Sequence, residues 1–192
     1  RRAWWRLLLI PLLLPFAVAY ALKLLPRKRM KERMHAVLLG PNLGRDEVKE
    51  LAEGFARDLV AEGLYPQALE QLKQEAAAGR RIVVATAAPS FYVAPLARHL
   101  GVTDVVATNE TWRADRLLPE IKGENCHGSE KRRKLERFLR TAGIARRDAH
   151  IRFFSDDISD LPSFEWCDEA IAVNPCTGLD ALARERHWTV LD

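Results

Sequence analysis

Three carboxylates lie within five positions, directly after a short apolar run. The run, Ile151–Phe154, combines β-branched and aromatic residues and predicts a buried strand. The carboxylates that follow belong to Asp156, Asp157 and Asp160. Carboxylates crowded at a strand end repel one another unless a cation lies among them. Mg²⁺ suits such a place, because it takes one or two protein carboxylates together with waters and a substrate phosphate. The alternative is an ordinary helix start, since Asp and Ser are good N-caps.

A hydroxyl follows another predicted strand. Thr86 comes directly after the β-branched run at residues 82–85 and precedes two alanines and a proline. Its hydroxyl, with the backbone N–H groups of Ala87 and Ala88, would form a compact anion cradle. The alternative is a helix-entry hydroxyl that satisfies local backbone groups.

A lysine completes the set of candidate residues. Lys131 lies in the first turn of a helix predicted over residues 129–141. A cation there opposes the helix dipole unless an anion balances it, and lysine serves as a point charge on phosphate. We expect the basic residues that follow it, Arg132, Arg133 and Lys134, to form a solvated helix face.

The elements that must position these residues alternate along the chain. Helical patterns occupy residues 28–39, 46–62, 66–78, 90–100 and 129–141, and strand patterns occupy residues 82–85, 104–108, 151–154, 169–173 and 189–191, with a small hairpin at 110–119 and a helix between the last two strands. Such alternation predicts an α/β fold with a Rossmann-like parallel sheet covered by helices on both faces. Ligands bind at the carboxyl ends of such strands, so Thr86 and Asp156 are expected to converge.

Composition narrows the class of protein. Of 192 residues, 48% are apolar and 29% charged, as in a folded globular protein. Residues 1–34 hold nine Lys and Arg against one acid, whereas the rest holds 21 against 25. Because the positive charge belongs to one end, binding of nucleic acid is not expected. Three cysteines without a C-x-x-C pair argue against a disulfide framework or a zinc site and favour a reducing cytoplasm.

The N-terminal part of the chain is strongly apolar. The segment Leu7–Leu25 contains one charged residue and approaches the roughly 20 apolar residues that span a bilayer. Pro11 and Pro15 would kink a helix early, and basic residues flank both ends, so no orientation is favoured. We expect peripheral or monotopic contact with the inner face of a membrane through residues 1–34. The alternative is an apolar helix buried within the protein.

The order of the three chemical elements resembles that of a known family. The pieces are Val83–Pro89, Gly128–Lys131 and Ser155–Pro162, which are similar to the second, third and fourth motifs of the haloacid dehalogenase superfamily of phosphatases. Asn125–Gly128 ahead of the lysine resembles subfamily IB, which contains phosphoserine phosphatase-like hydrolases. Within it, the apolar segment is most similar to phosphatidylglycerophosphatase C-like hydrolases.

The resemblance implies a fold and a division into domains. It implies a helical cap over residues 1–63, with the apolar segment 7–25, and a catalytic core over 64–192. The family's first motif, Asp-x-Asp-x-Thr, does not occur in the sequence. We expect it, with the first core strand, upstream of Arg1.

The resemblance also implies a reaction and roles for residues. The reaction is Mg²⁺-dependent hydrolysis of a phosphomonoester through an aspartyl-phosphate. Asp156 would hold the metal, Thr86 and Ala87 would bind the phosphoryl group, and Lys131 would offset its charge. Asp160 would orient Lys131 or a metal-bound water. The apolar, basic cap favours a phospholipid head group as substrate; the alternatives are a soluble phosphoserine or small-metabolite phosphatase, and a catalytically inactive membrane-surface adaptor.

Overall fold

A computed structural model describes residues 4–40 and 43–191. Contacts divide the chain into two compact units, one made of Arg1–Val84 and Ala88–Asn125 and the other of Ala85–Ala87 and Cys126–Asp192. Pro41 and Asn42, in the turn predicted between the second and third helices, lie outside the described residues.

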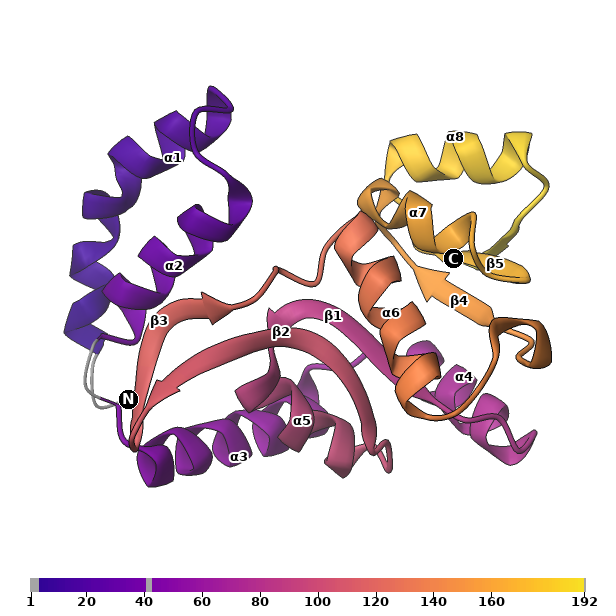
Figure 1. Cartoon of the computed structure of the whole chain (residues 1–192), viewed down its shortest axis with the longest axis horizontal. Coiled ribbons are helices and arrows are strands. Elements are labelled where there is room, and N and C mark those ends of the chain that lie inside the picture. The colour runs from indigo at the N-terminus through magenta and orange to yellow at the C-terminus, as the bar shows by residue number, and fades with distance from the viewer. Residues whose placement is uncertain (1–3, 41–42, 192) are drawn as a thin grey trace. The chain divides into compact units, whose positions relative to one another are not determined.

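The first unit holds most of the helices. Its elements are η1 (Trp4–Leu13), α1 (Leu14–Ala21), α2 (Arg27–Leu38), α3 (Arg45–Glu62), α4 (Pro66–Ala77), α5 (Ser90–His99), β2 (Asp104–Arg113) and β3 (Arg116–Lys122), together with the ends of β1 (Val83–Pro89) (Figure 1). Helix α3, in the predicted cap, packs along α5, in the predicted core. For this reason the contact division does not fall at the predicted boundary, residue 63.

A three-stranded sheet in the order β1-β2-β3 runs through this part of the chain. The predicted hairpin is present: β2 and β3 pair antiparallel up to Arg113 opposite Arg116, and Ala114 turns the chain with a φ of 49°. The prediction that β1 ends at residue 85 is wrong. The strand continues to Pro89 beside the ten-residue β2, so Thr86 and Ala87 lie within it.

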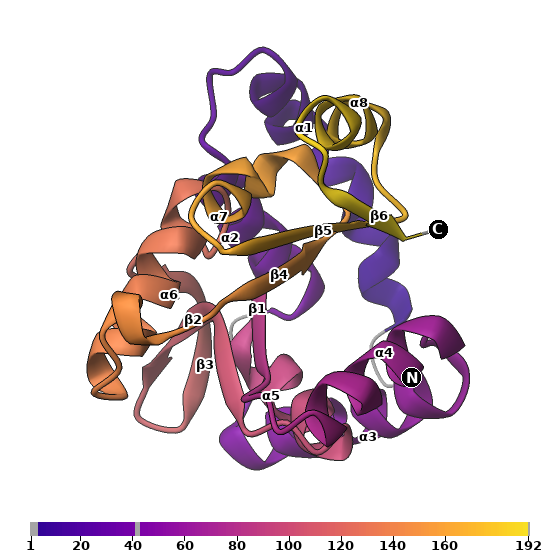
Figure 2. The ribbon, with the colours of Figure 1, turned by 90° about the vertical axis from the view of Figure 1, so that its right-hand side faces the viewer.

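The second unit is a small parallel α/β layer. Its elements are α6 (Ser129–Thr141), η2 (Arg146–Asp148), β4 (Arg152–Ser155), η3 (Ile158–Asp160), α7 (Leu161–Phe164), β5 (Glu169–Val173), α8 (Thr177–Glu185) and β6 (Thr189–Leu191). The strands pair in parallel, as predicted, and their order is β4-β5-β6. Helix α8 packs on β5 and β6 (Figure 2).

Aromatic packing fills the core of the second unit. Phe164 contacts Phe153 edge-on at 5.0 Å between ring centroids and stacks with Trp188 at 5.1 Å. Ile171 of β5 and Leu179 of α8 are almost fully buried as well. This core holds the strands whose carboxyl ends carry the candidate site.

Proline breaks the apolar N-terminal segment into two pieces. Pro11 lies inside η1, which has 3₁₀ geometry, and Pro15 lies in the first turn of α1, which ends after eight residues. Among the described residues, no helix combines the length and the apolar content needed to cross a bilayer. The alternative of a buried helix is not seen either, because within residues 7–25 only Leu13 is buried.

Helix α2 joins this segment to the rest of its unit. It packs against η1, α1 and β3. Lys28 Nζ donates to Gly123 O at 2.5 Å, Lys31 Nζ donates to Asn125 Oδ1 at 2.9 Å, and Glu32 Oε1 accepts from the Ile121 N–H at 3.1 Å. Part of the basic cluster predicted to face a membrane therefore binds groups within the protein.

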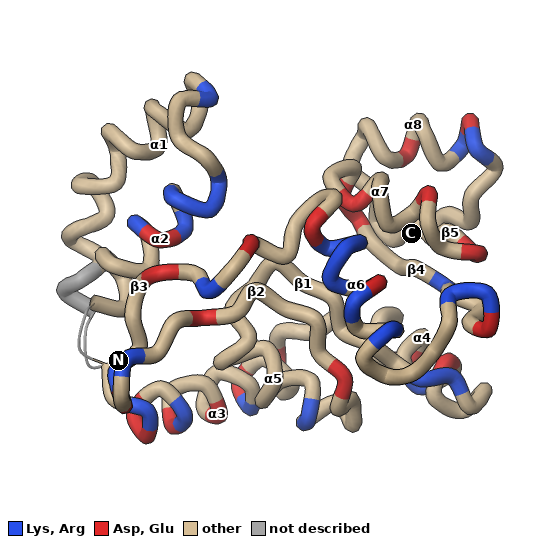
Figure 3. Tube along the Cα trace, viewed as in Figure 1, with Lys and Arg blue, Asp and Glu red and all other residues tan. Residues whose placement is uncertain are grey.

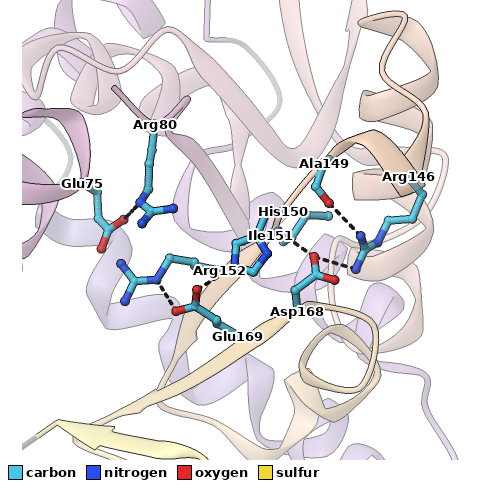
Figure 4. Close-up of polar contacts among 9 residues, drawn as sticks. All are labelled: Glu75, Arg80, Arg146, Ala149, His150, Ile151, Arg152, Asp168 and Glu169. Carbon is cyan, nitrogen blue, oxygen red and sulfur yellow. Dashed lines mark hydrogen bonds and ion pairs between the residues drawn. The ribbon is translucent and has the colours of Figure 1, made fainter. Parts of the chain in front are cut away.

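An arginine clasp closes the amino end of the β4–β5 layer. Arg146 pairs with Asp168 at 2.9 Å and donates to Ala149 O, while Asp168 Oδ2 also accepts from the Ile151 N–H at 2.7 Å (Figure 4). Arg146 donates to Trp166 O as well. The bonds from Arg146, and then from the Ile151 N–H, hold the pKa of the Asp168 carboxyl below its ordinary value of 3.8. The clasp stabilises the start of β4, and therefore the position of its other end.

We expect Arg146→Met to lower the free energy of unfolding of the complete protein by about 1–2 kcal/mol at pH 7, since it removes charge-assisted hydrogen bonds. Because the folded-state pKa of Asp168 is depressed, its contribution is present above 3.8 and is lost as the pH falls through the folded value. The difference between variant and wild type should therefore shrink under acid, as measured by urea unfolding across pH. Arg147→Met, at a side chain 89% exposed, is the matched control; equal losses in both variants would contradict the clasp.

Candidate active site

The two interpretations of the carboxylate cluster apply to two adjacent residues, Asp157 and Asp156. Asp157 accepts a hydrogen bond from the Ser159 N–H at 2.8 Å and caps η3, as in the helix-start alternative. Asp156 follows the last residue of β4, and its side chain is exposed. Its backbone oxygen accepts from the Cys176 N–H at 2.8 Å, which holds the loop while leaving the carboxylate available. Asp156 therefore occupies the strand-end position predicted for a ligand.

A buried ion pair lies four residues further on. Lys131 Nζ is 2.5 Å from Asp160 Oδ2, and the two residues are only 8% and 4% exposed. Ser155 Oγ donates to the same carboxylate oxygen at 2.7 Å. The other oxygen, Asp160 Oδ1, is buried without a hydrogen-bond partner among the described residues. The structure thus brings Lys131 and Asp160 together, as their predicted roles require.

The loop before α6 determines where Lys131 lies. Gly128, the N-cap, has a φ of 58° and a ψ of −133°, a conformation that is essentially restricted to glycine. A Cβ there would lie 3.5 Å from Ser159 O, so the loop passes close to η3. His127 Nδ1 lies 3.3 Å from Ser159 Oγ and connects the same two segments. These contacts bring the start of α6 against the loop that carries Asp160.

Sequence reasoning missed two polar contacts of this site. Ser155 and His127 were not singled out as contributors, although Ser155 ends the strand and His127 lies in the segment that resembles subfamily IB. The expectation for the basic residues after Lys131 is confirmed for two of them: Arg132 pairs with Glu136 at 2.9 Å, and Arg133 pairs with Glu130 on the exposed side of the helix.

Thr86 and Ala87 belong to the same compact unit as Lys131, Asp156 and Asp160. They lie in the middle of β1 instead of in a loop beyond it, and both have interactions with other groups of the protein. The strand thus extends past the residues predicted to form the compact anion cradle, and a cradle made by the Ala87 and Ala88 N–H groups stays a prediction. The roles of Thr86 and Ala87 in binding a phosphoryl group stay a prediction.

The residues present fit one side of a magnesium site. No group of three His, Cys, Asp or Glu side chains converges within residues 4–40 and 43–191 to form a complete cage. Mg²⁺ does not need one, because it keeps several waters and takes one or two carboxylates with substrate phosphate. The exposed Asp156 carboxylate suits a direct ligand, and the unpaired Asp160 Oδ1 suits an acceptor for a metal-bound water.

Comparison with known proteins decides the family. Residues 1–165 match the model of the haloacid dehalogenase-like hydrolases. The chain belongs to this family. Its fold is similar to that in the crystal structure of a protein of unknown function from Bordetella pertussis Tohama I, with a TM-score of 0.83 and 31% identity over 92% of this chain and 78% of that one.

Relatives named for phosphatase activity support the subgroup. A probable phosphatase of Mycobacterium tuberculosis is 29% identical over 162 residues, which are 83% of this chain and 55% of the relative. A phosphoserine phosphatase of the same species is 27% identical over 146 residues, 76% of this chain and 47% of the relative. The chain thus spans about half the length of these curated relatives. The predicted superfamily and the phosphoserine phosphatase-like character are confirmed, whereas closeness to phosphatidylglycerophosphatase C stays a prediction.

We expect Lys131→Met to lower the free energy of unfolding by about 3–5 kcal/mol, because it leaves the Asp160 carboxylate buried without its cation. The double variant Lys131→Met/Asp160→Asn should recover most of this loss, since the amide is neutral and still accepts from Ser155. Urea unfolding of the complete protein measures both. A single variant as stable as wild type would show that the pair does not form.

Proposed function

We propose that the complete protein is a phosphatase that hydrolyses a phosphomonoester through an aspartyl-phosphate, with Mg²⁺ bound at Asp156. The observation that carries this proposal is the buried pair of Lys131 and Asp160, next to an exposed carboxylate at the end of a parallel strand. The family to which the chain belongs and the names of its relatives support the reaction class.

The buried pair is better explained by function than by stability. A buried ion pair is often no more stabilising than apolar side chains of the same volume, because desolvation offsets the attraction of the charges. An ammonium group held in a low-dielectric site, however, interacts strongly with a phosphoryl group as negative charge develops on it. Lys131 is held in position by Asp160, whose Oδ2 is in turn held by Ser155.

Other residues bind the phosphoryl group and the metal. Thr86 and Ala87 bind and orient the phosphoryl group, as the order of the motifs predicts. Asp156 holds the metal, and Asp160 Oδ1 accepts a hydrogen bond from a water. Bound Mg²⁺ would neutralise the non-bridging phosphate oxygens. The nucleophile would be an aspartate of an Asp-x-Asp-x-Thr motif, which does not occur in residues 1–192.

We propose a phospholipid head group as the substrate. The net charge of residues 1–34 and the exposed apolar side chains between Leu7 and Leu24 support a substrate at a lipid surface. We expect the complete protein to release phosphate faster from phosphatidylglycerophosphate in mixed micelles than from phosphoserine at equal concentration. Faster turnover of phosphoserine would favour the soluble-metabolite alternative.

We expect Asp156→Asn to reduce Mg²⁺-dependent phosphate release by at least roughly 100-fold, because it removes a charged ligand of the metal. Asp157→Asn is the matched control: the adjacent residue caps η3, and asparagine caps equally well. Phosphate release from p-nitrophenyl phosphate, measured with and without Mg²⁺, compares the two variants. Unchanged turnover in the Asp156 variant, or equal losses in both, would refute the metal assignment. A wild-type protein without any turnover would leave the inactive adaptor as the better description.

A further inference from the structure

Exposed apolar side chains concentrate in one segment of the first unit. Of the 14 large hydrophobic residues that are exposed in the described structure, nine lie between positions 7 and 24. They are Leu7, Leu8, Ile10, Leu12, Leu14, Val18, Tyr20, Leu22 and Leu24. Single exposed hydrophobic residues are normal, but a contiguous apolar patch marks a surface that contacts another phase or molecule.

The fold of this unit explains why the segment remains uncovered. Helix α2 packs against one side of η1 and α1, where Leu13 is buried and Arg33 lies 5.2 Å over the ring of Phe16. The segment is apolar around its whole circumference, as in helices surrounded by apolar material. One polar helix cannot cover it, so most of its surface needs an apolar environment from elsewhere.

The charged residues near the segment indicate which kind of apolar environment it contacts. Residues 1–31 contain no Asp or Glu, and Glu32 is only 9% exposed, because it pairs with Arg29 and accepts from the Ile121 N–H. Lys23, Arg27 and Arg29 are exposed at and beyond the end of α1. Figure 3 shows Lys and Arg positions in blue along the turn after α1 and the start of α2. Apolar side chains beside cations suit an anionic lipid surface. A second copy of the chain fits poorly, because a two-fold contact would bring two segments of net positive charge together.

The contacts of α2 determine how the segment meets the lipid. Lys28 and Lys31 bind Gly123 O and Asn125 Oδ1, so α2 is held to the residues after β3. Crossing the bilayer would pull η1 and α1 away from α2, or α2 away from those polar partners. The segment can instead lie in the interfacial plane, with its cations at the level of the head groups.

We infer that residues 7–25 form a monotopic docking surface for an anionic lipid bilayer, inserted into one leaflet and flanked by Lys23, Arg27 and Arg29. The segment belongs to the first unit, whereas Lys131 and Asp156 belong to the second. The inference stands whether or not the enzyme acts on a lipid.

Vesicle flotation of the complete protein tests the inference. Wild type should float with vesicles of phosphatidylcholine and phosphatidylglycerol at a molar ratio of about 3:1, and less with pure phosphatidylcholine or at high salt. Leu8→Ser/Leu24→Ser, at side chains 70% and 76% exposed, should weaken partitioning at least about tenfold. Leu51→Ser/Tyr65→Ser, at side chains 51% and 73% exposed outside the segment, is the matched control and should float like wild type.

Three results would overturn the inference. The first is wild-type protein that stays unbound, and the second is flotation unchanged in the Leu8/Leu24 variant. The third is wild-type protein that does not bind vesicles but self-associates, while the Leu8/Leu24 variant is monomeric. That combination would show that the surface binds a second copy of the chain. Phosphate release from p-nitrophenyl phosphate by the same preparation tests the proposed function separately, because that soluble ester needs no membrane.

Discussion

A lysine ammonium and a carboxylate that share a site almost closed to water form the interaction on which the candidate site depends. Removing both charges from water is costly, and only close contact and further hydrogen bonds offset that cost. Three local features provide them: the end of β4 supplies Ser155, η3 turns Asp160 back toward the strand, and Gly128 lets α6 begin against the same loop. The parallel β4–β5–β6 layer and its aromatic core keep these features in register.

The chain combines this polar site with an unusually apolar surface. Of the large hydrophobic residues exposed in the described structure, one, Ile158, lies in the α/β unit around Lys131, whereas nine lie between Leu7 and Leu24. Both arrangements follow from local sequence. Pro11 and Pro15 shorten the apolar helix, and the polar helix α2 binds the residues after β3 through Lys28 and Lys31. A phosphatase whose cap rests on lipid would join the two properties in one molecule.

Most of the element pattern could be predicted from the sequence, because helices and strands alternate with clear periodicity and strong turn signals. Strand lengths could not: β1 extends through Thr86 to Pro89 because of its neighbour β2, a tertiary effect that local propensity does not contain. The division of the chain into two compact units also depends on tertiary packing, because it follows the packing of α3 on α5.

At the candidate site, residue types predicted Lys131, Asp156 and Asp160, since charged groups at element ends are conspicuous in a sequence. They did not reveal which of two adjacent aspartates caps η3, because Asp156 and Asp157 are equivalent as residue types and only backbone geometry separates them. Ser155 and His127 were missed for a similar reason. The contribution of a serine or histidine to a site can be recognised only when the structure shows its hydrogen-bond partner from another segment.

A crystal structure of the complete protein with Mg²⁺ and orthovanadate, a mimic of the transferring phosphoryl group, tests the central claim most directly. The account predicts the vanadium centre beside Lys131, with a vanadate oxygen within hydrogen-bond distance of its Nζ, the contact between Lys131 and Asp160 retained, and Asp156 among the metal ligands. Vanadate bound at a site that does not include Lys131, or a Lys131 side chain turned out to solvent away from Asp160, would contradict it.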